Sequence, residues 1–209
     1  MLQLVQIMFT KKDLFSASVT GFYTGLIAWQ VLMFLNKPSV FGLPVAWFIV
    51  IIPILWILGV NLGYFLGRWM PFFNQFGRFA AVGFTNFAVY TGILNIFLWQ
   101  TKISSGAWYS FFVAVAFLVS VLHSYGWNKY WVFESGQSGQ GGAEFGKFII
   151  VTGIAGLINV AMASFVVNAL HPMFGTTPEG WANIGGIAGS AVALVFSFVG
   201  IRLVVFKKN

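Results

Sequence analysis

Cysteine is absent from this chain of 209 residues, and charged residues make up only 7% of it. The absence of cysteine excludes disulfides, thiol nucleophiles and thiolate metal sites. An average soluble protein has about 25% charged residues, so this chain has too few to cover a folded surface in water. Disorder is excluded as well, because disordered chains combine low hydrophobicity with high charge.

Acidic and imidazole side chains are also scarce. The chain has four Asp and Glu residues and two His residues. The sequence contains no paired carboxylates, no metal-ligand spacing, no nucleophile triad and no Walker-type phosphate loop. We therefore expect no enzyme activity, no catalytic residue, no bound metal, no cofactor and no ATP-driven transport by this chain alone.

Hydrophobic residues are abundant: they make up 59% of the chain, and its mean hydropathy is +0.87. Charged positions separate six charge-free runs of 22 to 31 residues, and a helix needs about 20 apolar residues to cross a bilayer. The runs do not alternate, which favours helices over barrel strands. The sequence predicts an all-α integral membrane protein with six transmembrane helices, at residues 14–35, 43–66, 78–99, 107–131, 147–169 and 182–205.

Positive charge is distributed unevenly between the two ends of these helices. The net charge is +7, but the basic residues form no arm or stripe, so we expect no nucleic-acid partner. Nine of the eleven Lys and Arg residues fall on one side, and only Lys37 and Lys102 on the other. Because basic loops stay in the cytoplasm, we predict a multi-pass protein of the cell (plasma or inner) membrane with both termini cytoplasmic. The first helix is expected to be a retained signal anchor.

The chain contains two segments that match as copies of one helical hairpin, residues 77–133 and 146–206. Gly77-Arg78-Phe79 matches Gly146-Lys147-Phe148, and residues 129–133 match residues 202–206. Both copies begin and end on the predicted cytoplasmic side, so an axis along the membrane normal would relate them, as in the parallel repeats of some transporters. A general likeness among apolar hairpins is the alternative explanation.

These hairpins carry a set of short motifs. They are Arg78-Phe79, Val82-Gly83 and Asn86, then Asn128-Lys129-Tyr130-Trp131-Val132-Phe133, then Lys147-Phe148, and finally Arg202 with Val205-Phe206. Through them, residues 77–207 resemble the GtrA-like family of membrane proteins. The resemblance implies a four-helix domain that moves polyprenyl-phosphate-linked sugars across the membrane for cell-surface polysaccharide synthesis or glycosylation, or that assists the glycosyltransferase. Residues 1–70 are not covered and form a separate N-terminal segment of two predicted helices.

Four basic residues of the two copies are candidate ligands for a lipid phosphate: Arg78, Lys129, Lys147 and Arg202. Lys129 and Arg202 each precede one more apolar turn, which places the charge about 6 Å inside the helix end. Ionisable groups at such depth tend to face a cavity or a partner, and we expect no acidic residue within the six helices to neutralise them. Arg78 and Lys147 open helices, whose N-termini can hold a phosphate. The repeat would bring all four to one cytoplasmic vestibule; snorkelling to the headgroups and topogenic charge are the alternatives.

Four polar residues within the predicted helices are candidates to line a path for the sugar: Asn86, His123, Asn128 and Asn159. A sugar in apolar lipid needs hydrogen-bond partners, which amides and imidazole supply. The alternative is hydrogen bonding between helices, which contributes about 0.6 kcal/mol on average in membranes.

Small residues recur at four-residue spacing in three of the predicted helices. They are Gly21 and Gly25, then Gly59, Gly63 and Gly67, and finally Gly185, Gly189 and Ala193. Such stripes either hold a bundle together or mediate self-association. Pro53 predicts a kink or a break in the second helix.

We expect a carrier whose partners are a polyprenyl-phosphate-linked sugar and the surrounding membrane lipids. A four-helix domain has little internal space for such a path, which favours a homodimer. Two alternatives stay open. The chain is a membrane anchor or scaffold for a glycosyltransferase, or it is a small-solute exporter, which His123 and the small-residue stripes would permit.

Overall fold

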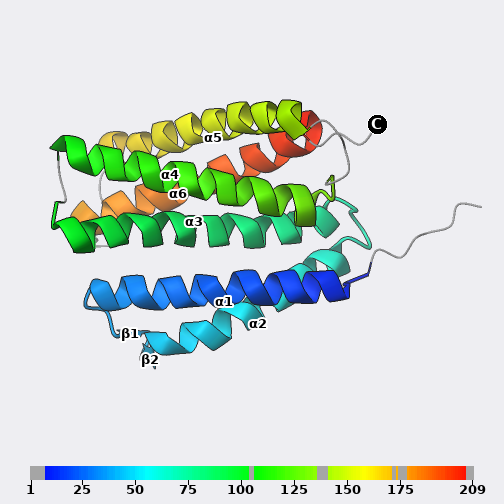
Figure 1. The fold of residues 1–209 in the computed structure, drawn as a ribbon, viewed down its shortest axis with the longest axis horizontal. Coiled ribbons are helices and arrows are strands. Elements are labelled where there is room, and N and C mark those ends of the chain that lie inside the picture. The colour runs from blue at the N-terminus through cyan, green and yellow to red at the C-terminus, as the bar shows by residue number, and fades with distance from the viewer. Residues whose placement is uncertain (1–7, 104–105, 136–140, 171–172, 174–177, 206–209) are drawn as a thin grey trace, which may run out of the picture. The chain divides into compact units, whose positions relative to one another are not determined.

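Six helices dominate the computed structural model, which describes residues 8–103, 106–135, 141–170, 173 and 178–205 (Figure 1). In chain order its elements are α1 (Lys11–Phe34), β1 (Ser39–Val40), β2 (Leu43–Pro44), η1 (Val45–Trp47), α2 (Phe48–Leu66), α3 (Phe73–Thr101), α4 (Gly106–Trp127), η2 (Asn128–Val132), α5 (Gly141–Ala169), α6 (Pro178–Gly200) and η3 (Ile201–Val205). The antiparallel pair β1 and β2 is a short hairpin between the first two helices. The predicted all-α class and the six helices are confirmed.

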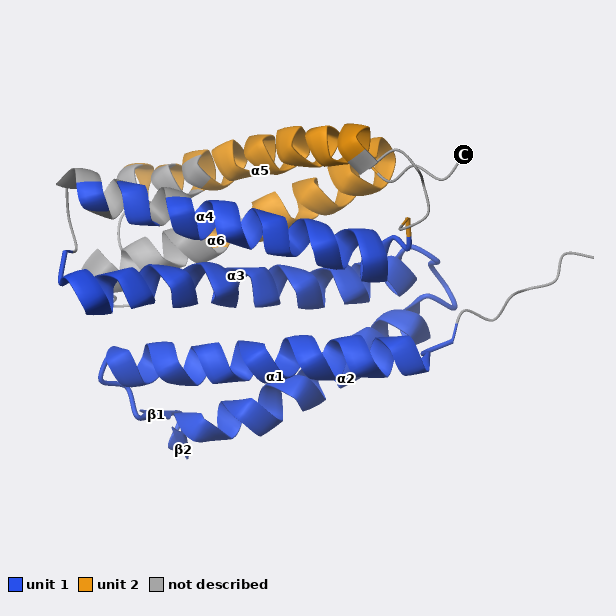
Figure 2. Cartoon of the chain, in the orientation of Figure 1, with its two compact units in different colours: residues 1–134 blue, residues 135–209 orange. Residues whose placement is uncertain are grey.

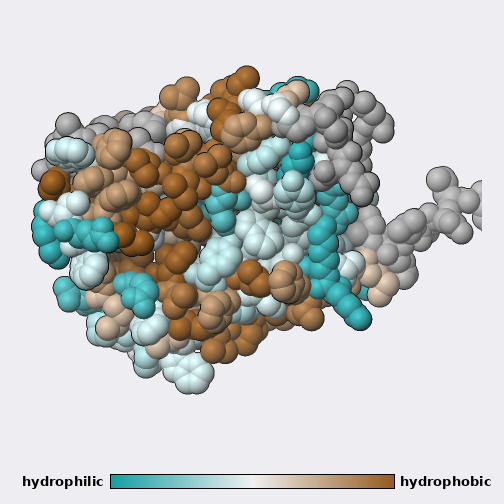
Figure 3. Space-filling view, in the orientation of Figure 1, coloured by the Kyte–Doolittle hydropathy of each residue, from teal (hydrophilic) through white to brown (hydrophobic). Residues whose placement is uncertain are grey.

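The helices have the length and composition of membrane spans. Among the described residues, four segments are long and apolar enough to cross a bilayer: Lys11–Phe34, Val45–Leu66, Phe73–Thr101 and Gly142–Asn159. A shorter apolar helix covers Ala191–Val205. On the face drawn in Figure 3, apolar residues cover the middles of the helices, and hydrophilic residues gather mainly toward their ends. The chain is therefore a multi-pass membrane protein.

The chain forms two compact units, residues 1–134 (unit 1) and residues 135–209 (unit 2) (Figure 2). In unit 1, α1 packs against α2 and α3, and α3 packs against α4. In unit 2, α5 packs against α6 and η3. The N-terminal helix pair thus shares a unit with the first hairpin of the repeat. The division of the chain into segments 1–70 and 77–207 stays a prediction.

The helices α1, α5 and α6 begin earlier than predicted, and each shift brings an acidic residue into a helix, which is Glu179 in α6. α1 begins at Lys11 because Thr10 caps it. The Thr10 hydroxyl accepts a hydrogen bond from the Asp13 backbone N–H, and the Asp13 carboxylate accepts one from the Thr10 backbone N–H. α5 begins at Gly141, which places Glu144 in its first turn. The expectation that no acidic residue lies within the six helices is therefore wrong, because a helix N-terminus favours negative charge.

Both hairpins of the repeat end in a π-helical turn. η2 continues α4 and η3 continues α6, and the second residue of each turn is the cation of the matched segment, Lys129 or Arg202. Such turns are rare in proteins and are frequent at functional sites. Their occurrence at matched positions supports the repeat.

Close helix contacts in unit 1 depend on the small residues of α1. A Cβ atom on Gly21 would lie 2.5 Å from the Cα atom of Pro53, and one on Gly25 would overlap the carbonyl oxygen of Phe48. This stripe therefore holds α1 against α2. α2 runs from Phe48 to Leu66 through Pro53, so the helix does not break there.

Replacing Gly25 by alanine should destabilise the protein, whereas the same change at Gly59 should not. The new methyl group at Gly25 would meet the α2 backbone, which cannot rotate away, while a Cβ atom on Gly59 meets nothing within 4 Å. Overpacking costs about 1–3 kcal/mol, and alanine is about 1 kcal/mol better than glycine within a helix. Thermal unfolding in detergent, followed by tryptophan fluorescence, should give a lower midpoint for G25A and an equal or higher midpoint for G59A. Equal midpoints for the two variants would contradict the described packing of α1 on α2.

Candidate functional site

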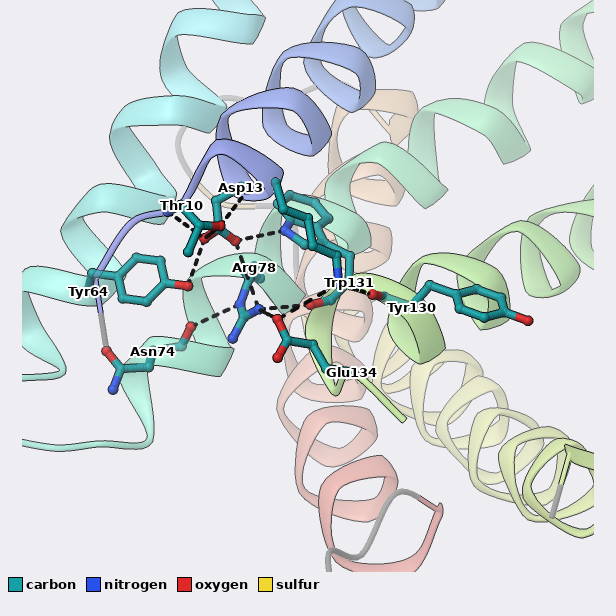
Figure 4. Close-up of polar contacts among 9 residues, drawn as sticks. Thr10, Asp13, Tyr64, Asn74, Arg78, Tyr130, Trp131 and Glu134 are labelled. Carbon is teal, nitrogen blue, oxygen red and sulfur yellow. Dashed lines mark hydrogen bonds and ion pairs between the residues drawn. The ribbon is translucent and has the colours of Figure 1, made fainter. Parts of the chain in front are cut away.

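A buried carboxylate organises one end of unit 1 (Figure 4). Asp13 is 1% exposed, and its Oδ2 accepts hydrogen bonds from the backbone N–H and the hydroxyl of Thr10, at 3.0 and 2.7 Å. The Tyr64 hydroxyl donates to the same oxygen at 3.0 Å, and the Trp131 indole N–H donates to Oδ1 at 2.9 Å. The donors come from the cap of α1, the end of α2 and the turn η2. Four donors fill most of the lone-pair positions of a carboxylate.

Arg78, near the start of α3, lies beside this carboxylate and is 6% exposed. Its Nη1 atom is 3.8 Å from the Asp13 Oδ1 atom and donates a hydrogen bond to Glu134 Oε1 at 2.9 Å. The same nitrogen donates to the Trp131 carbonyl oxygen at 2.8 Å, and the Arg78 Cζ atom is 5.8 Å from the centre of the Tyr64 ring. Two carboxylates therefore neutralise a cation for which the sequence predicted no counter-charge.

Lys12 extends these contacts to the exposed rim. Its Nζ atom donates to the Tyr130 carbonyl oxygen at 2.6 Å and lies 3.9 Å from Glu134 Oε1. The network thus joins α1, α2, α3 and η2, so it fixes the N-terminal helix pair to the first hairpin. Within the part of the chain that the structure describes, no group of three or more His, Asp and Glu side chains could hold a metal ion.

Lys129 and Arg202 each lie near an aromatic ring of the preceding helical turn. Lys129 is 7% exposed, and its Nζ atom lies 3.3 Å from the Tyr125 hydroxyl and 5.6 Å from the centre of that ring. The Arg202 Cζ atom lies 5.9 Å from the centre of the Phe198 ring. In each hairpin the ring comes four residues before the cation, which places it one turn earlier on the same helix face. Cation–π attraction therefore stabilises both basic groups.

The four predicted phosphate ligands belong to different units. Arg78 and Lys129 lie in unit 1, and Lys147 and Arg202 lie in unit 2. Lys147 is exposed, whereas the matched Arg78 is buried among its partners. A single vestibule for all four stays a prediction.

Two of the four predicted path residues lie together in unit 1. His123 Nδ1 is 3.3 Å from Asn86 Oδ1, and His123 Nε2 is 2.5 Å from the Tyr23 hydroxyl oxygen. A ring protonated at Nδ1 would donate to Asn86 and accept from Tyr23. These contacts link α4 to α3 and α1. Sequence reasoning missed Tyr23; the signal was a tyrosine in the interior of an apolar helix, away from the helix ends where membrane tyrosines concentrate.

The other two path residues have different surroundings. Asn128 is 1% exposed; its Nδ2 donates to the carbonyl oxygen and the hydroxyl of Ser124, at 2.8 and 3.1 Å. Its Oδ1 has no hydrogen-bond partner among the described residues. Asn159 lies where α5 meets α6, since a Cβ atom on Gly189 would be 2.5 Å from the Asn159 carbonyl oxygen. Asn128 thus presents a buried acceptor that requires a donor, whereas Asn159 lies at a helix packing contact.

Comparison with known proteins covers the two hairpins. A family model described as "GtrA/DPMS, transmembrane domain" matches residues 78–206, which are more than half of the chain. This match confirms the resemblance and includes both π-helical turns. No curated protein and no solved structure matches the chain. Asp13 and Tyr64 lie before the matched residues, so the network in Figure 4 joins the matched domain to helices that the family model does not cover.

Replacing Asp13 by asparagine should destabilise the protein far more than replacing Glu134 by glutamine. A carboxamide has a single acceptor oxygen, so D13N would leave at least one of the four donors facing an NH₂ group. Breaking a buried charge pair costs about 3–5 kcal/mol, whereas the Glu134 side chain is 48% exposed and such a pair contributes about 1 kcal/mol or less. Unfolding of the purified variants in detergent measures both losses. A D13N loss as small as that of E134Q would show that the buried carboxylate does not hold these helix ends together.

Proposed function

Because the chain belongs to the GtrA/DPMS transmembrane-domain family, we propose that it is a carrier that helps a polyprenyl-phosphate-linked sugar cross the bilayer. Family membership supports a membrane protein involved in glycosyl- or polysaccharide-related processes. The carrier activity, the lipid-linked substrate and a non-catalytic mode of action belong to the proposal. In it, the chain lies in the cell membrane with both termini in the cytoplasm, as the distribution of basic residues predicts.

The proposal depends on one observation, the cation in the π-helical turn that ends each hairpin. Lys129 and Arg202 occupy the same position in η2 and η3. A basic group below the headgroups is costly, and proteins retain it where it meets negative charge or a polar cavity. In this proposal a lipid phosphate at the edge of the hydrocarbon layer contributes negative charge at these turns, and guanidinium suits bidentate phosphate binding.

Arg78 has a different role in this proposal. Asp13 and Glu134 lie beside it, so its charge is already balanced. Its contacts fix the N-terminal helix pair, and the remaining candidates are phosphate ligands within their own units, Lys129 in unit 1 and Lys147 and Arg202 in unit 2. Lys147 is exposed at the start of α5, where it attracts the anionic headgroup.

The sugar follows polar side chains of unit 1. Asn128 directly precedes Lys129, and its buried Oδ1 can accept a hydrogen bond from a sugar hydroxyl next to the phosphate. Asn86 and His123 lie farther along the helices and exchange their mutual hydrogen bond for bonds to the passing sugar. Net transport then follows consumption of the sugar on the far side, since the sequence contains no ATP-binding motif.

Lys129→Gln and Arg202→Gln should each slow the crossing of a lipid-linked sugar. A hydrogen bond to a charged group contributes about 1.5–3 kcal/mol, so we expect the rate to fall about tenfold to a hundredfold. The measurement uses the purified full chain in liposomes that contain a labelled polyprenyl-phosphate-linked sugar. An impermeant reagent outside the liposomes reports how fast the label reaches the outer leaflet.

Lys102→Gln is the matched control for this experiment. Lys102 also lies near an aromatic ring, with its Nζ atom 6.0 Å from the centre of the Trp99 ring, but it follows α3 at the end opposite to Arg78. The Lys102→Gln variant should keep the wild-type rate of sugar crossing. Normal rates for both Lys129→Gln and Arg202→Gln would exclude these residues as phosphate ligands. If the wild-type protein does not speed the crossing of the lipid-linked sugar but co-purifies with a glycosyltransferase, the scaffold alternative would replace the carrier proposal.

A further inference from the structure

We infer that an apolar groove between α2 and α3 holds part of the isoprenoid chain of a polyprenyl phosphate, with the phosphate at Arg68, a lipid position additional to those proposed at Lys129 and Arg202. The groove has a volume of about 260 Å³, and hydrophobic side chains and glycines of both helices line it, from Leu55 to Leu66 on α2 and from Phe73 to Phe84 on α3. This inference rests on the proposed function for the identity of the lipid.

The groove lies alongside a close contact of the two helices, since a Cβ atom on Gly77 would lie 3.3 Å from the Gly59 carbonyl oxygen. A Cβ atom on Gly63 would lie 3.0 Å from the Cα atom of Gly77, so the backbones are in contact there. One turn earlier on α2, a Cβ atom on Gly59 would meet nothing within 4 Å. Farther from the α2–α3 loop, the Trp56 indole N–H donates to the Thr85 hydroxyl at 3.0 Å and joins the helices again. The open space at Gly59 lies between these two contacts, and the groove continues along the helix surfaces past them, from Leu55 to Leu66 on α2.

The groove has the length and the opening that a lipid chain requires. Leu55 and Leu66 are eleven positions apart on α2, a rise of about 16 Å, which is about half of a hydrocarbon core of ~30 Å. Leu55, Leu62 and Phe84 line the groove and are 51%, 54% and 59% exposed, so the groove opens at the surface of the helices. A chain from one leaflet would lie along it, with the headgroup at the loop that joins α2 to α3.

Arg68 supplies positive charge at that loop. It is exposed, follows the last residue of α2 by two positions, and its Cζ atom lies 5.6 Å from the centre of the Phe65 ring. It forms no ion pair among the residues that the structure describes, whereas Asp13 and Glu134 both lie beside Arg78. The neighbouring Trp69 is 67% exposed, as is typical of the headgroup level. An unpaired guanidinium beside an apolar groove is complementary to a phosphate attached to a hydrocarbon chain.

Photocrosslinking of the full chain in phosphatidylcholine nanodiscs tests this inference. The probe is a polyprenyl phosphate with a diazirine in its isoprenoid chain, and mass spectrometry locates the labelled residues. Labels should fall on the groove residues of α2 and α3. Gly59→Leu should reduce this labelling about tenfold, because the new side chain displaces roughly two methylenes of the lipid at about 0.8 kcal/mol each. Arg68→Gln should reduce it about fivefold, since one basic group near the membrane surface contributes about 1 kcal/mol.

Gly153→Leu is the matched control, because a Cβ atom on Gly153 in α5 also meets nothing within 4 Å. It should keep wild-type labelling. Two further probes carry the same diazirine: a polyprenol without phosphate, and a phosphatidic acid. The inference requires several-fold stronger groove labelling by polyprenyl phosphate than by either.

Equal labelling by the three probes overturns the inference, and so does full labelling of a folded Gly59→Leu variant. If Gly59→Leu does not fold, Arg68→Gln is used in its place, because residue 68 lies outside the helices. Full labelling of Arg68→Gln then overturns the inference. The readout needs no transport. Groove labelling without faster sugar crossing would therefore contradict the proposed carrier function alone. Faster crossing without groove labelling would contradict only the inference that the groove binds the lipid.

Discussion

The buried carboxylate of Asp13 is the contact on which the arrangement of unit 1 depends. A charge within an apolar bundle is costly unless donors and a counter-charge surround it. Thr10, Tyr64 and Trp131 supply the donors and Arg78 supplies the counter-charge, and these residues come from four different elements. Because the cost is offset only when all four elements meet, the carboxylate selects one arrangement of these helix ends.

This contact also distinguishes structural cations from candidate ligand-binding cations. Arg78 has carboxylates beside it, which cancel most of its field. Arg202 lies near the Phe198 ring, and a ring stabilises a cation without cancelling its charge. A cation against a ring keeps its attraction for a phosphate, which is why the proposed phosphate site follows the π-helical turns and leaves Arg78 to the fold.

The apolar runs predicted the number and the approximate positions of the helices, because the thickness of a bilayer fixes how many apolar residues a helix needs. The same reasoning placed Asp13 outside the first helix, since it treated each charged residue as the end of a run. What stabilises Asp13 lies 51 and 118 residues away, at Tyr64 and Trp131, and a charge pattern contains no information about such partners. The bond between Tyr23 and His123 joins residues 100 positions apart and was missed for the same reason. Lys129 and Arg202 could be proposed as candidates from the sequence because each lies in a short contiguous motif that recurs in the chain.

The N-terminal helix pair makes the two hairpins of the family domain inequivalent. The hairpins share a π-helical turn, a cation and a ring, which suits two similar phosphate positions. Only unit 1 contains α1 and α2, which contribute Asp13, Tyr23 and one wall of the α2–α3 groove. Two equivalent hairpins would bind a lipid equally well. In the proposed mechanism α2 gives the first hairpin alone a surface for the lipid's hydrocarbon chain, so the two hairpins bind lipid unequally.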